Sequence, residues 1–120
     1  MWNHRPIMEE WSQETGLPIR NFEQGQMSQL LSYLFEEGFL EERGHAERGE
    51  VLYADKGCAQ CHDGGGASAL PRKSYTVTDV TAGMWRHGPR VRQAMRDQRV
   101  TWPYLSGDDV ADLVAWLNSR

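Results

Sequence analysis

The two cysteines of this 120-residue chain lie three positions apart, in the run Cys58-Ala59-Gln60-Cys61-His62. Two thiols at this spacing can form thioethers with the two vinyl groups on one edge of a porphyrin. The imidazole that follows can then ligate the iron. The spacing therefore predicts one covalently bound haem c, held by Cys58 and Cys61, with His62 as an iron ligand.

Three other chemistries use closely spaced cysteines. A zinc site needs a fourth ligand, which His45 or His87 would have to supply from far along the chain. A redox-active pair should follow a strand in a βαβ unit, and the sequence shows no such unit. A disulfide over so short a loop would stabilise little. Haem is the interpretation that uses all three residues of the motif.

The segments beside the motif favour helices and a turn. Ala46–Tyr53 reads as a helix that runs into the motif, with Gly49 and Tyr53 four positions apart on one face. Gly64–Gly66 favours a turn after the motif, and Pro71 follows nine residues after His62. We expect the first helix to position the haem-binding residues.

Two sequence patterns predict a last helix near the C-terminus: a cap at its start and an apolar stripe along one face. Ser106 and Asp109 have the spacing of a capping box, with carboxylates at the positive end of the helix dipole. The apolar stripe that follows has helical spacing: Val110, Leu113, Val114 and Leu117.

A middle helix is predicted from Val80 to about Arg99, interrupted near Gly88-Pro89 because a proline removes a helical hydrogen bond. Residues 67–79 look irregular, and Thr76–Thr78 is too short to build a sheet. The predicted fold class is all-α, wrapped around a haem.

Residues 45–120 resemble the class I c-type cytochromes. In that family a helix with a glycine and an aromatic residue crosses the C-terminal helix, and the glycine allows close approach. Gly49 and Tyr53 match the first helix, and Trp116 matches the aromatic residue of the last. The resemblance also implies that the carbonyl of Pro71 accepts the Nδ1 proton of the haem-ligating histidine. An ordinary loop proline is the alternative interpretation.

The second iron ligand departs from the family pattern. Where many class I cytochromes have Met-Pro before the last helix, this chain has Trp102-Pro103. The candidates are Met84 and Met95 on one face of the middle helix, and His87. Either methionine could instead be an adaptable core residue, and His87 could bond a haem propionate. A distal site open to small ligands is a further alternative.

Residues 1–34 align without a gap to residues 84–117, which indicates an internal repeat. Met1 aligns with Met84 and His4 with His87, whereas Met95 aligns with a serine. Since equivalent ligands should keep their chemistry, Met84 is the favoured ligand and Met95 the alternative. The apolar stripe of the last helix is repeated by Met27, Leu30, Leu31 and Leu34.

The repeat predicts two units. Residues 1–44 would be the back half of a cytochrome domain without a haem motif, with a charged helical linker over 35–44, and residues 45–120 the haem domain. The favoured explanation is a piece of a tandem di-haem protein whose first half-domain lies upstream. The alternative is a half-domain used as it stands, docked on the haem domain or swapped with a second chain, because its apolar stripe would seek a partner.

Charge and hydropathy limit the partners. A net charge of −4 argues against nucleic acid as the main partner, and no run is long and apolar enough to span a membrane. Residues 1–25 are polar and show no signal peptide. Because bacteria attach haem covalently outside the cytoplasm, we expect a periplasmic or otherwise exported protein, either a mature form or part of a longer precursor.

The predicted function is single-electron transfer between redox proteins, with histidine and methionine as axial ligands, rather than catalysis. A thioether ligand would raise the reduction potential relative to a second imidazole. Two other functions remain open: a haem domain with a free iron position, of peroxidase or gas-sensing type, and a docking module of a larger redox complex.

Overall fold

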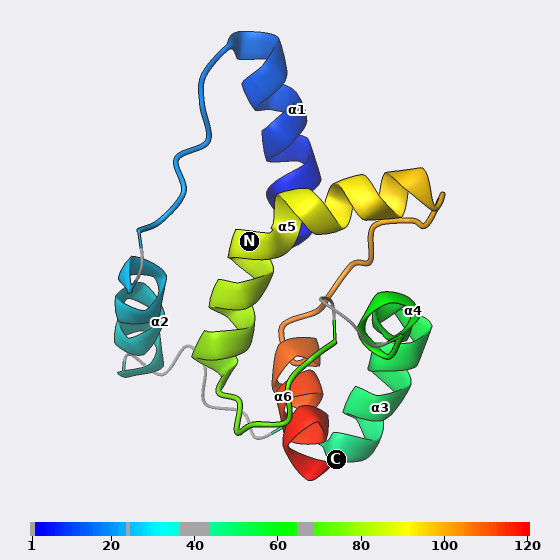
Figure 1. The fold of residues 1–120 in the computed structure, drawn as a ribbon. Coiled ribbons are helices and arrows are strands. Elements are labelled where there is room, and N and C mark those ends of the chain that lie inside the picture. Colours follow the sequence, from blue (N-terminus) through cyan, green and yellow to red (C-terminus); the bar gives the residue numbers. More distant parts are fainter. Residues whose placement is uncertain (1, 24, 37–43, 65–68) are drawn as a thin grey trace.

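A computed structural model describes residues 2–23, 25–36, 44–64 and 69–120 of the chain (Figure 1). The described residues form helices joined by loops and contain no strand, so the predicted all-α fold is confirmed. The elements, in chain order, are η1 Trp2–His4, α1 Arg5–Thr15, α2 Gln26–Glu36, α3 Ala46–Asp55, α4 Cys58–His62, α5 Val77–Asp97 and α6 Asp109–Ser119.

Helices α3 and α6 pack closely together, as the resemblance implied. A Cβ atom at Gly49 would clash with the carbonyl of Asp112 and lie 2.8 Å from the Cβ atom of Trp116. The rings of Tyr53 and Trp116 lie 4.2 Å apart between their centroids. Gly44 makes a second close approach, to the carbonyl of Ala111. Glycine at these two positions lets the two backbones touch.

The start of α6 contains part of the predicted capping box. The hydroxyl of Ser106 donates to Asp109 over 2.6 Å, and its amide donates over 2.8 Å. Burial alone would raise the pKa of Asp109, but the hydrogen bonds from Ser106 outweigh it and hold the pKa below its usual value. Asp109 is therefore charged at neutral pH. Its carboxylate accepts the hydrogen bonds of the Ser106 amide and hydroxyl in the turn that leads into α6.

The middle helix α5 begins three residues before the predicted start. Thr76 and Asp79 form a full capping box, in which each side chain bonds the other residue's backbone amide. The interpretation of residues 77–79 as irregular was therefore wrong, because this cap outweighs the low helix propensity of the β-branched residues beside it. Pro89 lies inside α5, and Figure 1 shows the helix sharply bent about half-way along.

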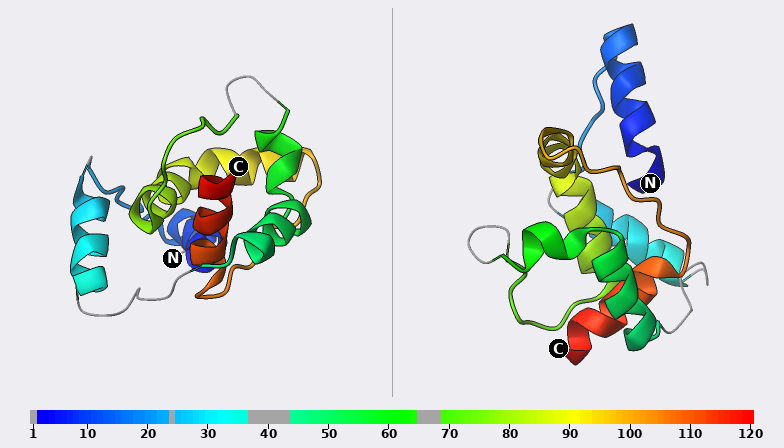
Figure 2. Two further views of the ribbon diagram at one scale, coloured as in Figure 1. Left: turned by 90° about the horizontal axis from the view of Figure 1, so that it is seen from below. Right: turned by 90° about the vertical axis from the view of Figure 1, so that its right-hand side faces the viewer.

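The N-terminal segment packs on α5 and on the loop that precedes α6. Trp2 stacks on Trp102 with 4.1 Å between ring centroids and donates a hydrogen bond to the carbonyl of Pro103. The side-chain amide of Asn3 bonds both the amide and the carbonyl of Leu105. Figures 1 and 2 show α2 on the opposite side of α5 from α3 and α4.

The two predicted repeats have matching helices. Displaced by the 83 positions that align residue 1 with residue 84, α2 begins and ends where α6 does. Gly16 and Arg99, which are equivalent under this displacement, both have left-handed backbones, with φ of 69° and 58°. Met1 and most of the charged linker, 37–43, lie outside the described residues. No helix within the described ranges has the length and apolar character of a bilayer-spanning segment.

Candidate cofactor site

The two cysteines and His62 lie together on the short helix α4, directly after α3. The turn between the helices passes through Gly57, whose φ of 77° is left-handed and favours glycine. Tyr53 donates a hydrogen bond of 2.7 Å to the carboxylate of Asp63, next to His62. This bond ties the end of α4 back to α3, so the motif is held on a fixed support.

The side chain of Cys58 packs against an apolar cluster rather than facing only solvent. Burial raises the pKa of the Cys58 thiol, which therefore keeps its proton at neutral pH. Both cysteines are half-buried and form no disulfide with each other. The cluster is made of Tyr53, Leu105 and Leu113, with Trp2, Leu52, Ala59, Leu70, Met84, Val110 and Trp116 packed against it beside Cys58.

The structure separates the two methionine candidates. Met84 is half-buried and belongs to the same apolar cluster as Cys58. Met95 lies further along α5, where it lines a cavity of about 230 Å³ together with Pro6 and Glu10 of α1 and with Trp102. Only Met84 of this pair is brought into contact with the cluster around the motif.

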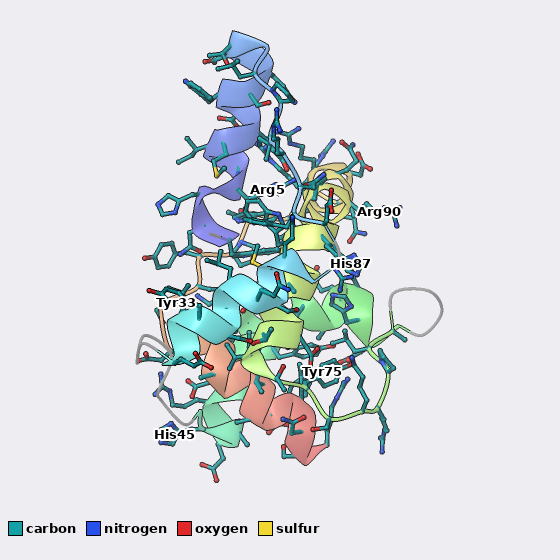
Figure 3. The ribbon with its side chains drawn as sticks, turned by 90° about the vertical axis from the view of Figure 1, so that its left-hand side faces the viewer. Arg5, Tyr33, His45, Tyr75, His87 and Arg90 are labelled. Carbon is teal, nitrogen blue, oxygen red and sulfur yellow. The ribbon has the colours of Figure 1, made fainter. Side chains whose placement is uncertain are left out.

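His87 lies on the side of α5 near α4 (Figure 3). Partial burial of its ring, followed by the charges of Arg86 and Arg90 and by His62, holds the pKa of His87 below its usual value. The ring is therefore mostly neutral at neutral pH and within electrostatic range of the proximal candidate His62. His87 shares a region with the motif, although it is exposed overall.

Pro71 is exposed, and its carbonyl accepts a hydrogen bond of 2.6 Å from the hydroxyl of Tyr75. Tyr75 is buried, and both its amide and its carbonyl bond the side chain of Asn118 at the end of α6. The loop that carries Pro71 is therefore anchored to the last helix. A carbonyl oxygen has two lone pairs, so this bond is compatible with the predicted acceptor role of Pro71.

Two acidic residues that support the site were missed by the sequence analysis. Asp63 holds α4, as described above. Asp112 is 1% exposed and accepts the amide of His45 over 2.7 Å, while Arg48 lies 3.1 Å from its other oxygen. It caps the start of α3 from within α6. The available signal was a charged residue between Ala111 and Leu113 in a helix that carries an apolar stripe.

The zinc interpretation finds no support in the geometry. His45 is engaged at the start of α3, and Figure 3 shows it at the end of the molecule away from His87. Across the part of the chain that the structure describes, no three His, Cys, Asp or Glu side chains converge as a metal site. The thiol of Cys58 and the thioether of Met84 lie at one apolar cluster, and Cys61 and His62 follow Cys58 on the same short helix. Thiols, an imidazole and a thioether are together a donor set that suits haem.

Comparison with known families decides between these chemistries. Residues 44–117 match the family described as cytochrome C oxidase, cbb3-type, subunit III. The chain belongs to this family of c-type cytochrome domains. Its match begins just before α3 and ends within α6, so it covers the motif and the whole helical frame around it. The domain therefore binds haem c covalently, and its fold is that of a class I-like cytochrome.

No curated protein and no solved structure matches the chain. The family assignment establishes the haem and an electron-transferring domain, which acts with redox partners.

Proposed function

We propose that this cytochrome domain carries single electrons, with His62 and Met84 as the axial ligands of its haem iron. The observation that carries the proposal is the packing of Cys58 on α4 and Met84 on α5 within one apolar cluster. This arrangement brings a thioether from a second helix to the neighbourhood of the motif. Bound haem c supplies a metal that gains and loses one electron.

The chain's own residues attach the haem, orient the His62 ring and keep water away from the site. The thiols of Cys58 and Cys61 tether the group to α4, and the Tyr53–Asp63 bond holds that helix in place. The carbonyl of Pro71, anchored through Tyr75, orients the His62 ring by accepting its Nδ1 proton. The apolar cluster lowers the local dielectric and excludes water, which favours the less charged ferrous form.

A pair of methionine variants tests the distal ligand. Met84→Ala should abolish the weak far-red band of ferric iron ligated by methionine and lower the reduction potential, with the haem still covalently attached. Met95→Ala is the matched control, since Met95 lies on the same helix but lines the cavity beside α1. Its spectrum should match that of the unchanged protein.

The other results would identify a different site. A far-red band that survives Met84→Ala would overturn Met84 as the ligand. If the unchanged protein has no such band and His87→Ala opens the iron to carbon monoxide, the ligand is His87. Carbon monoxide binding to the unchanged ferrous protein would show an open iron position and favour a ligand-binding or peroxidase-type domain.

The proposal extends to organisation and setting. Residues 45–120 form the haem domain, and residues 1–44 form a partial repeat of its back half with a linker. The coincidence of α2 with α6 supports this division. We place the protein in the periplasm or another exported compartment, because covalent haem attachment occurs there in bacteria. Its partners are redox proteins rather than nucleic acid, in keeping with the net charge of −4.

A further inference from the structure

Equivalent residues of the two predicted repeats lie in contact with one another. Glu9 and Arg92 occupy equivalent positions of the repeats, and their side chains form an ion pair of 2.7 Å. Arg5 and Gly88 are also equivalent, and a Cβ at Gly88 would lie 3.7 Å from the Cγ of Arg5. Contacts between equivalent residues are the mark of a twofold interface.

The tryptophan contacts of the two predicted repeats correspond in part. Trp2 stacks on Trp102 in the loop before α6. Its equivalent, Trp85, belongs to the cluster against which Ile19 packs, and Ile19 is the equivalent of Trp102. Trp85 also meets Phe22 edge-on, with 6.0 Å between ring centroids. Each predicted repeat thus packs a tryptophan against the loop of the other.

Helix α6 uses two faces. Val110 belongs to the apolar cluster beside Trp2 and Met84, and a second set of residues receives α3, of which Leu113 and Trp116 also reach this cluster. The receiving face offers a small residue, an acceptor for the first amide of α3, a buried leucine and an aromatic ring. These residues are Ala111, Asp112, Leu113 and Trp116.

Among the residues that the structure describes, the buried side chains of α2 correspond to the first of these faces. Met27 and Leu31 are buried against Ala82 and Trp85 of α5. The equivalent of the receiving face is exposed but keeps its chemistry: Ser28, Gln29, Leu30 and Tyr33 stand for the four residues of α6. Leu30 is 38% exposed and Tyr33 59% exposed. Figure 3 shows Tyr33 projecting outward from α2.

We propose that this face of α2 docks a helix of the α3 type from a second cytochrome c unit. The occupant carries glycine where it crosses α2 and an aromatic residue four positions later. The ring of that residue packs against Tyr33 as the Tyr53 ring packs, tilted by 38°, against Trp116. Gln29 is neutral where Asp112 is charged, so the occupant needs no counterpart of Arg48. The inference rests on the repeat organisation proposed above and is independent of which residue ligates the iron.

The test uses the full haem-loaded chain and a peptide of residues 44–57 as the probe. A hydrocarbon staple between positions 47 and 51, which are exposed on α3, makes the peptide helical without touching its packing face. We expect a 1:1 complex by calorimetry. Leu30→Glu or Tyr33→Glu in the chain should weaken it about tenfold or more, since both are central to the face. Gly49→Val in the peptide should do the same.

Ile7→Glu is the control variant, because Ile7 is 65% exposed on α1 and lies off this face. It should leave peptide binding unchanged. Each chain variant must keep the haem spectrum and thermal midpoint of the unchanged protein, which shows that its fold is intact. Binding that survives Leu30→Glu and Tyr33→Glu would overturn the proposal, as would no binding by a peptide that is helical by circular dichroism.

Sedimentation adds one outcome. If the chain forms dimers and Leu30→Glu makes them dissociate, the face is occupied by α2 of a second copy. This result too would overturn the proposed occupant. If the peptide does not bind to α2, the spectrum expected for the Met84 variant does not change. The docking proposal and the ligand proposal are therefore tested separately.

Discussion

Single residues decide how closely the frame of the haem site can pack. Gly49 sits where α3 crosses α6, and any side chain there meets the backbone of Asp112 rather than a movable side chain. The glycine and the aromatic partner of this crossing were predictable, because both follow from the spacing within one helix. Asp112 was not, since its role depends on α3 placing the amide of His45 against a helix 67 residues away.

Gly49→Ala should therefore destabilise the haem-loaded protein by about 1–3 kcal/mol or more, the usual cost of forcing an extra methyl group into a packed interface. Urea unfolding followed by haem absorbance measures the change. Gly107→Ala is the control, because Gly107 lies in the turn before α6 and a Cβ there has no neighbour within 4 Å. Equal midpoints for the two variants would show that the close approach does not constrain the fold.

At the scale of elements, sequence patterns located α3 and α6 well, because caps and apolar stripes are local signals. The start of α5 was predicted three residues too late, because the Thr76–Asp79 capping box was not recognised in the sequence. The aligned apolar positions predicted an internal repeat, and docking of its N-terminal copy on the haem domain was one of the alternatives. The individual contacts, such as Trp2 with Trp102, could not be predicted because they join residues far apart in the chain.

The contact between α1 and α5 has a charged centre that makes it depend on pH. Burial alone would raise the pKa of Glu9, but its hydrogen bonds to Arg5 and Arg92 outweigh this and hold the pKa below its usual value. A carboxylate with a lowered pKa in the folded state contributes stability above its unfolded pKa. That contribution is lost as pH falls through the folded pKa.

Glu9→Gln should cost about 1–2 kcal/mol at pH 7, the range for a half-buried charged hydrogen bond. The difference between variant and unchanged protein should shrink as pH falls below about 4.5, where the unfolded carboxyl begins to bind protons. Thermal unfolding across this pH range measures both. Exposed Glu14 on the same helix is the control, and Glu14→Gln should leave stability unchanged. A Glu9→Gln difference independent of pH would contradict the role of this charge.

At the scale of the whole molecule, residues 44–117 form the cytochrome domain that carries the haem motif, and α2 in the N-terminal segment presents an exposed helix face. The motif could be assigned from five consecutive residues, because covalent haem attachment demands that spacing and little else. The distal ligand could be narrowed but not assigned, since Trp102 replaces the usual methionine. The predicted repeat favoured Met84 over Met95, and the folded chain places Met84 at the apolar cluster and Met95 at the cavity beside α1.

Covalent attachment of haem to Cys58 and Cys61 is most directly tested by the intact mass of the exported protein under denaturing conditions. We predict the mass of the polypeptide plus one haem, with the absorption of haem retained after extraction with acidified solvent. Replacing both cysteines by serine should return the mass to that of the polypeptide alone. A colourless protein with the bare polypeptide mass, from cells that mature other c-type cytochromes, would contradict the account.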